Sequence, residues 1–171
     1  MARSTIGDLE ARHLADSAAI WPHVPRTATR LADLGSGAGF PGLVLAILAA
    51  DERPDMDVHL VESDARKTAF LETVRRDLGL ARVSIHNDRI EDVEPFGADV
   101  VTARALAPLD RLLQLAFRHL GPNGRCLFPK GRMWSDEVAS ARRLWNFDLD
   151  VHAAPEGGDG CILQVKGLTR V

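Results

Sequence analysis

The sequence predicts an α/β fold in which a mostly parallel sheet of seven strands ends in an antiparallel hairpin. After residue 28, short strand-like runs of β-branched and aliphatic residues alternate with stretches of helical periodicity, which indicates βαβ units. A glycine-dense turn follows the first of these runs. Near the C-terminus, two strand-like runs are joined by a short glycine-rich link, so the two strands must be antiparallel.

The first 28 residues are expected to form a helical cap, with a helix over 9–21, and residues 29–171 to form the main domain. The first strand, 29–34, leads into a helix over 41–50 that is apolar all round and therefore buried.

The second strand, 57–62, leads into a helix that Asp64 caps and Gly79 ends. The residues spaced to form the apolar face of this helix are Phe70, Leu71, Val74 and Leu78.

Two more strands, a helix and a fifth strand follow, and a last helix precedes the hairpin. Pro108 suits the first position of its helix, and Gly121-Pro122 ends it. The predicted strands lie at 82–87, 98–102, 124–128, 148–153 and 161–168, and the predicted helices at 108–120 and 134–146.

The bulk composition is that of an ordinary single globular domain of 171 residues. No apolar run approaches the ~20 residues of a membrane span, and no signal peptide is evident, so we expect a cytoplasmic protein. Cys126 and Cys161 lie in apolar runs without metal-ligand spacing, so we expect buried thiols and no metal site.

The charge is unevenly distributed along the chain. A net charge of −3 argues against strong non-specific binding of nucleic acid. Residues 51–99 carry −6 and residues 100–171 carry +3, so the C-terminal part could face an anionic substrate. Chance explains this distribution equally well.

The glycine-dense turn is the strongest functional signal. Gly35, Gly37, Gly39 and Gly42 let the backbone approach a ligand closely. The spacing matches both the dinucleotide fingerprint and the acid-plus-glycines loop of S-adenosylmethionine (SAM) methyltransferases. Asp33 stands near the end of the strand. Its carboxylate disfavours a pyrophosphate but could hold the ammonium of a methionine moiety, directly or through water. We therefore favour SAM, and the closing hairpin also favours class I methyltransferases over dinucleotide dehydrogenases.

Further candidates stand at the ends of the next three strands. Glu62 could accept hydrogen bonds from the ribose hydroxyls of SAM or NAD. Ile90 could pack on an adenine ring, and either its backbone or Glu91 could hydrogen-bond to the polar edge of the ring, although an ordinary polar turn would look the same. Arg104 lies in the central crevice of the sheet, where it could hold the cofactor's carboxylate or orient a base or phosphate; a surface salt bridge is the alternative.

The fifth strand ends in a basic, aromatic segment. Lys130, Arg132 and Trp134 suit phosphate contact and base stacking in an RNA complex, but equally a basic loop beside a core tryptophan. The sequence lacks an Asn-Pro-Pro-Tyr-type turn, a Pro-Cys loop nucleophile, zinc spacing and a Walker loop. A nucleophile that needs no deprotonation, such as guanine N7, fits this lack. Catalysis would then be mostly orientation, which can supply up to ~7–11 kcal/mol.

Four motifs together resemble the bacterial small-subunit ribosomal RNA guanine-N7 methyltransferases, the RsmG or GidB family. They are Arg12-His13-Leu14-Ala15-Asp16-Ser17, similar to Arg-His-x-x-Asp-Ser; Asp33 to Gly42, similar to Asp-x-Gly-Ser-Gly-x-Gly-x-Pro-Gly; Arg104-Ala105, similar to Ser-Arg-Ala with Ala103 in place of serine; and Lys130-Gly131, similar to Lys-Gly.

The resemblance implies methyl transfer from SAM to N7 of guanine 527 in 16S ribosomal RNA, with S-adenosylhomocysteine as the product. The expected partner is 16S RNA in the 30S subunit or its precursor, and we expect a monomer. The expected cofactor-binding residues are Gly35, Gly37, Gly39, Phe40, Glu62, Ile90, Glu91 and Arg104. Arg104 and Lys130 are expected to orient the substrate. The expected RNA contacts are Arg12, His13, Lys130, Arg132 and Trp134.

Three points remain open at this stage. Family members usually have further helices before the Arg-His motif, an extension that we expect to be largely missing here, and its absence could weaken methylation. A SAM methyltransferase of small molecules or proteins is one alternative, which a closed apolar pocket would favour. A NAD-binding module without chemistry of its own is the other.

Overall fold

The computed structural model describes residues 2–155 and 158–171 and forms a single α/β layer structure. The helices are α1 (Ala2–Ala18), the 3₁₀ turn η1 (Trp21–His23), α2 (Gly42–Glu52), α3 (Ala65–Asp77), α4 (Leu109–His119) and α5 (Trp134–Ala141). The strands are β1 (Arg30–Leu34), β2 (Asp57–Val61), β3 (Val83–His86), β4 (Ala98–Thr102), β5 (Leu120–Lys130), β6 (Trp145–Ala153) and β7 (Cys161–Arg170).

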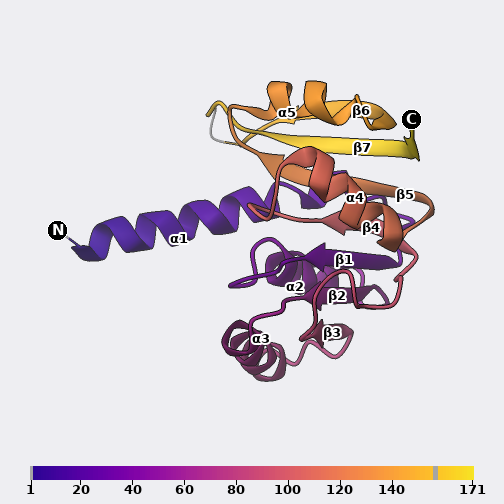
Figure 1. The fold of residues 1–171 in the computed structure, drawn as a ribbon. Helices are drawn as coiled ribbons and strands as arrows, with labels where there is room; N and C mark the ends of the chain where they lie inside the picture. The colour runs from indigo at the N-terminus through magenta and orange to yellow at the C-terminus, as the bar shows by residue number, and fades with distance from the viewer. Residues whose placement is uncertain (1, 156–157) are drawn as a thin grey trace.

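All seven strands form one sheet in the order β3-β2-β1-β4-β5-β7-β6 (Figure 1). The first five strands are parallel, and β7 is antiparallel to both β5 and β6. The predicted parallel sheet with an antiparallel C-terminal hairpin is therefore confirmed. The predicted link of that hairpin, 155–160, falls partly outside the described residues.

The sheet separates two hydrophobic clusters because neighbouring residues of a strand point to opposite faces. In β1, Leu31 belongs to the cluster under α2 and α3, whereas Ala32 belongs to the cluster under α4 and α5. Both cysteines are buried, as predicted. Burial raises the pKa of the Cys161 thiol to about 11 and raises that of Cys126 as well, so neither thiol is a nucleophile at neutral pH.

The carboxyl ends of the parallel strands meet at one edge of the sheet, and the predicted site residues follow those ends. The C-terminal part of α1 lies at this edge, while its N-terminal part projects away from the sheet (Figure 1). Among the described residues, no helix is long and apolar enough to cross a membrane.

Several element boundaries differ from the expected ones, including the start of the N-terminal helix at Ala2 instead of 9 and the start of β6 at Trp145 instead of 148. The N-terminal helix ends at Ala18, and Trp21 starts a separate turn that contains a proline at its first or second position. The helix predicted over 134–146 ends at Ala141, because alternate burial begins at Trp145, which pairs with β7 instead. The fifth strand begins at Leu120 rather than 124, beside a register shift in β4.

The predicted cap and stop of α3 are confirmed, but its predicted apolar face is only partly buried. Asp64 accepts hydrogen bonds from two backbone amides of the first turn, and Gly79 has a φ of +63° after the last turn. Leu71 is fully buried, whereas Phe70 and Leu78 are more than half exposed. The helix therefore covers the sheet by a narrower stripe than its spacing indicates.

Candidate functional site

The turn after β1 adopts a conformation that only glycine takes without strain. Gly35, Gly37 and Gly39 have φ values of +69°, +54° and +99°. A Cβ on Gly35 would lie 2.8 Å from Leu106 Cδ1. The amide of Gly37 donates a 2.8 Å hydrogen bond to Glu62 Oε2, which ties the turn to the end of β2.

A cleft of about 520 Å³ lies against this turn, a size suited to a nucleoside cofactor. We call it the first cleft. It brings together six of the predicted cofactor residues: Gly35, Gly37, Glu62, Ile90, Glu91 and Arg104. The rest of its lining is Val61, Ser63, Lys67, Asp88, Arg89, Ala105, Leu106, Ala107, Arg111 and Leu115.

Gly39 and Phe40, two further predicted cofactor residues, lie outside the lining of the first cleft. A Cβ on Gly39 would lie 2.6 Å from Leu43 Cδ1, so this glycine lets the turn pack on α2. Phe40 precedes a cis proline, and its ring lies 5.7 Å from the ring of His13 on α1. Both residues thus shape the turn and its contact with α1.

Glu62 uses its carboxylate to order the surrounding backbone. Oε2 accepts from Gly37, and Oε1 accepts a 3.0 Å hydrogen bond from the amide of Asp64. Each carboxylate oxygen can accept a second hydrogen bond, so Glu62 can still receive a hydroxyl in the cleft.

Asp33 does not line the cleft, so a direct contact with a ligand ammonium is wrong, whereas the expected contact through water stays a prediction. The residue has no exposed surface, and Thr102 Oγ1 donates a 2.7 Å hydrogen bond to its Oδ1. Any side chain on Gly42 would collide with its carboxylate, so the acid sits directly beneath the turn. Burial raises the pKa of Asp33 to about 6.

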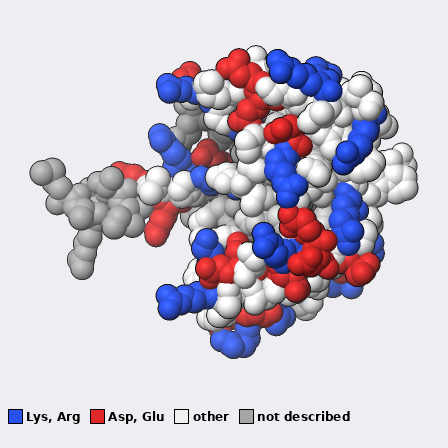
Figure 2. Space-filling model, in the orientation of Figure 1, with Lys and Arg blue, Asp and Glu red and all other residues white. Residues whose placement is uncertain are grey.

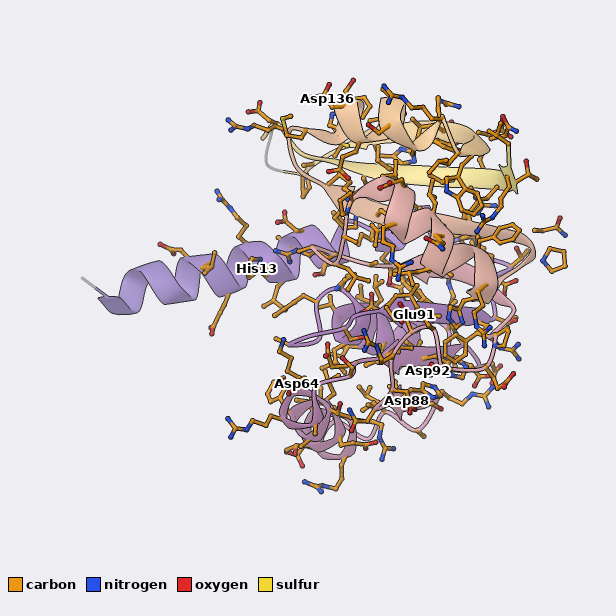
Figure 3. All side chains as sticks on the ribbon, in the orientation of Figure 1. His13, Asp64, Asp88, Glu91, Asp92 and Asp136 are labelled. Atoms are coloured by element: carbon orange, nitrogen blue, oxygen red, sulfur yellow. The ribbon has the colours of Figure 1, made fainter. Side chains whose placement is uncertain are left out.

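Residues 88–91 of the loop after β3 line the first cleft. Glu91 Oε1 forms a 2.7 Å ion pair with Arg111 Nη2 of α4, and both groups are about half exposed. Ile90 is buried, and its carbonyl oxygen lies 3.0 Å from Nε2 of His119. Figure 3 shows that Asp88 and Glu91 come from this loop, whereas His13 comes from α1.

Arg104 joins α1 to the sheet edge. Its Nη2 lies 2.5 Å from His13 Nδ1. Because a guanidinium only donates hydrogen bonds, the imidazole nitrogen must be the acceptor. This contact places the Arg-His motif of the N-terminal helix directly at the candidate site.

A second cleft of about 570 Å³ lies on the other side of the segment 104–107. Both clefts share these four residues, so the segment is the wall between them. Within the wall, Ala105 has a φ of +50°, a left-handed conformation that is rare for alanine. The remaining lining residues of the second cleft are Asp16, Pro108, Pro129, Lys130, Gly131 and Glu137.

Lys130 holds the wall in place. Its Nζ donates to the carbonyl oxygen of Ala107 at 2.9 Å and to Glu137 Oε2 at 2.6 Å. The same Glu137 oxygen accepts a 2.8 Å hydrogen bond from the Leu109 amide at the start of α4. Lys130 thus stands in the second cleft with two of its three ammonium protons already engaged.

The other predicted RNA contacts do not line either cleft. Arg12 on α1 and Arg132 in the turn before α5 are exposed. Trp134 packs against the hydrophobic cluster under α5. Basic and acidic side chains alternate over the face shown in Figure 2, so this face presents no extended basic surface.

Sequence reasoning missed Asp16, Leu106 and Arg111 as lining residues. Asp16 belongs to a motif that the sequence analysis singled out, and Leu106 closely follows Arg104, so both had a weak signal. Arg111 had none, because only the packing of α4 brings it to the first cleft. No group of three or more metal-ligating side chains occurs in the part of the chain that the structure describes.

Comparison with known proteins gives one consistent family. The family model "GidB: rRNA small subunit methyltransferase G" matches residues 1–160. A protein named ribosomal RNA small subunit methyltransferase G from Paramagnetospirillum magneticum is 50% identical over 166 residues, which cover 97% of this chain and 78% of that protein. A protein of the same name from Rhodospirillum centenum is 48% identical, with 98% and 75% covered.

Solved structures match the fold. A SAM-dependent methyltransferase from Aquifex aeolicus has a TM-score of 0.70 at 13% identity, with 98% of each chain covered. TYW2 of M. jannaschii, in complex with AdoMet, has a TM-score of 0.68 at 16% identity, with 94% of this chain and 77% of that chain covered.

Proposed function

Because the chain belongs to the rRNA small subunit methyltransferase G (GidB) family, we propose that it transfers a methyl group from SAM to N7 of guanine 527 in 16S ribosomal RNA. The observation that carries this proposal is the pair of clefts separated only by the 104–107 wall. One cleft suits a nucleoside cofactor and the other suits a single base.

The first cleft fits SAM by its shape and its donor set. The glycine turn offers a backbone surface without side chains, and Glu62 offers carboxylate oxygens to ribose hydroxyls. Bound there, SAM supplies an electrophilic methyl group on a sulfonium. The residues proposed to hold it are Gly35, Gly37, Gly39, Phe40, Glu62, Ile90, Glu91 and Arg104, with Gly39 and Phe40 acting through the shape of the turn.

The residues of the chain act on the substrate by position rather than by proton transfer. Guanine N7 has a free lone pair at neutral pH, so no general base is needed. Arg104 touches both clefts and is held by His13, so it can fix a base relative to the cofactor. Lys130 fixes the wall through Ala107 and orients the substrate with its remaining proton.

RNA outside the target base would meet α1 and the turn before α5. Arg12 and Arg132 are exposed and suit phosphate contacts, and His13 contacts Arg104 at the site. We assign Trp134 to this surface too, through the part of its indole that the core leaves exposed.

Residues 1–28 are proposed to act as a cap. The protein would work as a monomer on the 30S subunit or its precursor, in the cytoplasm.

The lining of the second cleft argues against a small apolar substrate. Asp16, Arg104, Lys130 and Glu137 place charged groups around it, which suits a base that carries several hydrogen-bonding atoms. A NAD-binding role is disfavoured by Asp33, since a buried acid beneath the turn disfavours a pyrophosphate above it.

A methyl-transfer assay tests the proposal. Tritiated SAM is offered with 30S particles or with naked 16S RNA, and the labelled base is then mapped. We expect the tritiated methyl group at a single guanine and at no other position of the RNA. We also expect one of the two substrates to be labelled faster than the other. Label on another base or another atom, or thermal stabilisation by NAD with none by S-adenosylhomocysteine, would refute it.

A further inference from the structure

The second cleft contains one acidic group that the proposed mechanism does not use. Two carboxylates line the cleft, Asp16 and Glu137. Glu137 is engaged by Lys130 and by the amide of Leu109. The Asp16 side chain is partly exposed, and its carboxylate forms no hydrogen bond or ion pair with any residue that the structure describes.

The position of Asp16 follows from the helix that carries it. Asp16 lies three residues after His13, so both side chains are on the same face of α1. His13 contacts Arg104, which lines both clefts, and this contact turns the shared face towards the 104–107 wall. The lone carboxylate is therefore directed at the second cleft by a helix that is itself fixed at the site.

An unpaired carboxylate is an unfavourable neighbour for RNA phosphates, so its presence in an RNA-binding cleft calls for a ligand that donates hydrogen bonds. Guanine presents two parallel donors, N1–H and the 2-amino group, on the edge opposite N7. A carboxylate accepts both at once, in the two-pronged arrangement that gives strong, directional recognition. Adenine has no such pair of donors.

The rest of the cleft complements the same base. The ammonium of Lys130 keeps one proton for an acceptor after its two intramolecular contacts, and guanine O6 is such an acceptor. The ammonium of Lys130 can thus donate to O6, while the carboxylate of Asp16 accepts from N1–H and from the 2-amino group. With these groups bound, the edge of the base that carries N7 is directed towards the wall and the first cleft.

We propose that Asp16 is a specificity-determining residue that accepts hydrogen bonds from N1–H and the 2-amino group of the target guanine. This inference rests on the proposed function. It adds the feature that selects guanine, whereas Arg104 and the glycine turn account for the cofactor and the alignment.

Inosine tests the contact because it differs from guanosine only by the missing 2-amino group. 30S subunits are reconstituted with 16S RNA that carries guanosine or inosine at the target position, and single-turnover transfer rates are measured. Wild-type protein should methylate the inosine substrate roughly ten- to hundredfold more slowly, the usual effect of losing a hydrogen bond to a charged group. Asp16→Ala should be slow on both substrates and should lose most of this discrimination.

Asp8→Ala is the matched control. Asp8 is an exposed acid two turns earlier on α1, so its removal changes the net charge equally without touching the cleft. It should keep the wild-type ratio of the two rates. Thermal unfolding and titration with S-adenosylhomocysteine confirm that the Asp16 variant is folded and keeps an intact first cleft.

The outcomes separate the two claims. Transfer by the wild-type protein with an unchanged guanosine-to-inosine ratio in Asp16→Ala would overturn the role of Asp16 and leave the proposed function standing. Failure of the wild-type protein to label the guanosine subunits at all would overturn the proposed function, and this inference with it.

Discussion

Nη2 of Arg104 lies 2.5 Å from Nδ1 of His13, although 91 residues separate the two side chains in the sequence. The contact connects the N-terminal helix to the end of a central strand of the sheet. The same imidazole lies against Phe40 in the glycine turn. One histidine thus touches both the arginine at the wall and the turn that borders the first cleft.

Replacing Arg104 should abolish most activity without unfolding the protein. The guanidinium lines both clefts, and its removal takes away a positioned cation rather than a core side chain. We expect Arg104→Ala to reduce single-turnover methyl transfer about 10²–10³-fold, with thermal unfolding unchanged. Near-normal transfer would remove Arg104 from the site.

His13→Ala tests whether α1 positions Arg104. Loss of the imidazole frees the guanidinium and removes the ring contact with Phe40. Transfer should slow about ten- to hundredfold, while the affinity for S-adenosylhomocysteine changes less. Leu9→Ala, at an exposed position of the same helix, is the control. Equal rates for the two variants would contradict a positioning role.

Gly35→Ala should impair cofactor binding. Alanine at a φ of +69° costs about 1–2 kcal/mol, and its Cβ would press on Leu106 in the wall. Calorimetry should show at least roughly tenfold weaker binding of S-adenosylhomocysteine. Gly7→Ala, where a Cβ meets open space, should bind as the wild type does. Unaltered binding by Gly35→Ala would show that the turn does not touch the cofactor.

Asp33 should make folding stability depend on pH in a defined window. Its folded-state pKa is about 6, above the value of 3.8 expected for the unfolded chain. The folded protein therefore binds the proton more tightly, and stability falls as pH rises from about 4 to about 6 and then levels off.

Asp33→Asn removes this titration and keeps an acceptor for Thr102. The free energy of unfolding is measured with urea at about pH 4 and about pH 7.5. Between these two pH values, the difference between the variant and the wild type should shift in favour of the variant by up to about 3 kcal/mol. Asp51→Asn, an exposed acid on α2, should gain nothing. A pH-independent difference for Asp33→Asn would mean that the buried acid is ionised throughout.

Glu137 should matter for stability and for activity together. The Lys130 side chain is only 10% exposed, and Glu137→Ala leaves its ammonium with Ala107 alone. The change also leaves the Leu109 amide without its acceptor. We expect a loss of about 1–3 kcal/mol in unfolding free energy and slower transfer, because the wall is no longer held. Asp136→Ala, its exposed neighbour, should lose neither. A fully active Glu137 variant would show that the wall needs no such support.

The local pattern of the sequence predicts the sheet and the glycine turn well. Alternating strand and helix periods depend on neighbouring residues, and the turn needs glycine at each left-handed position, so both can be recognised without tertiary information. The end of α5 could not be placed in this way, because Trp145 joins β6 through pairing with a strand that lies later in the chain.

The composition of the site was harder to predict where distant segments meet. Nothing in the periodicity of α1 indicates which of its faces docks at Arg104, so Asp16 was not expected in a cleft. Lys130 was expected to orient the substrate and to contact RNA, but the sequence does not indicate that its ammonium also binds Glu137 of α5 and the carbonyl oxygen of Ala107. The burial of Asp33 likewise depends on how closely Gly42 and the start of α2 approach it.

The shared wall has a consequence for inhibitor design. Leu106 lines both chambers, and its methyl groups already rest against the glycine turn. A compound that binds in one cleft and displaces the Leu106 side chain would therefore change the shape of the other cleft. In a bisubstrate molecule, a nucleoside half and a purine half are linked across the wall. Such a molecule should bind with a higher affinity than either of its two fragments alone.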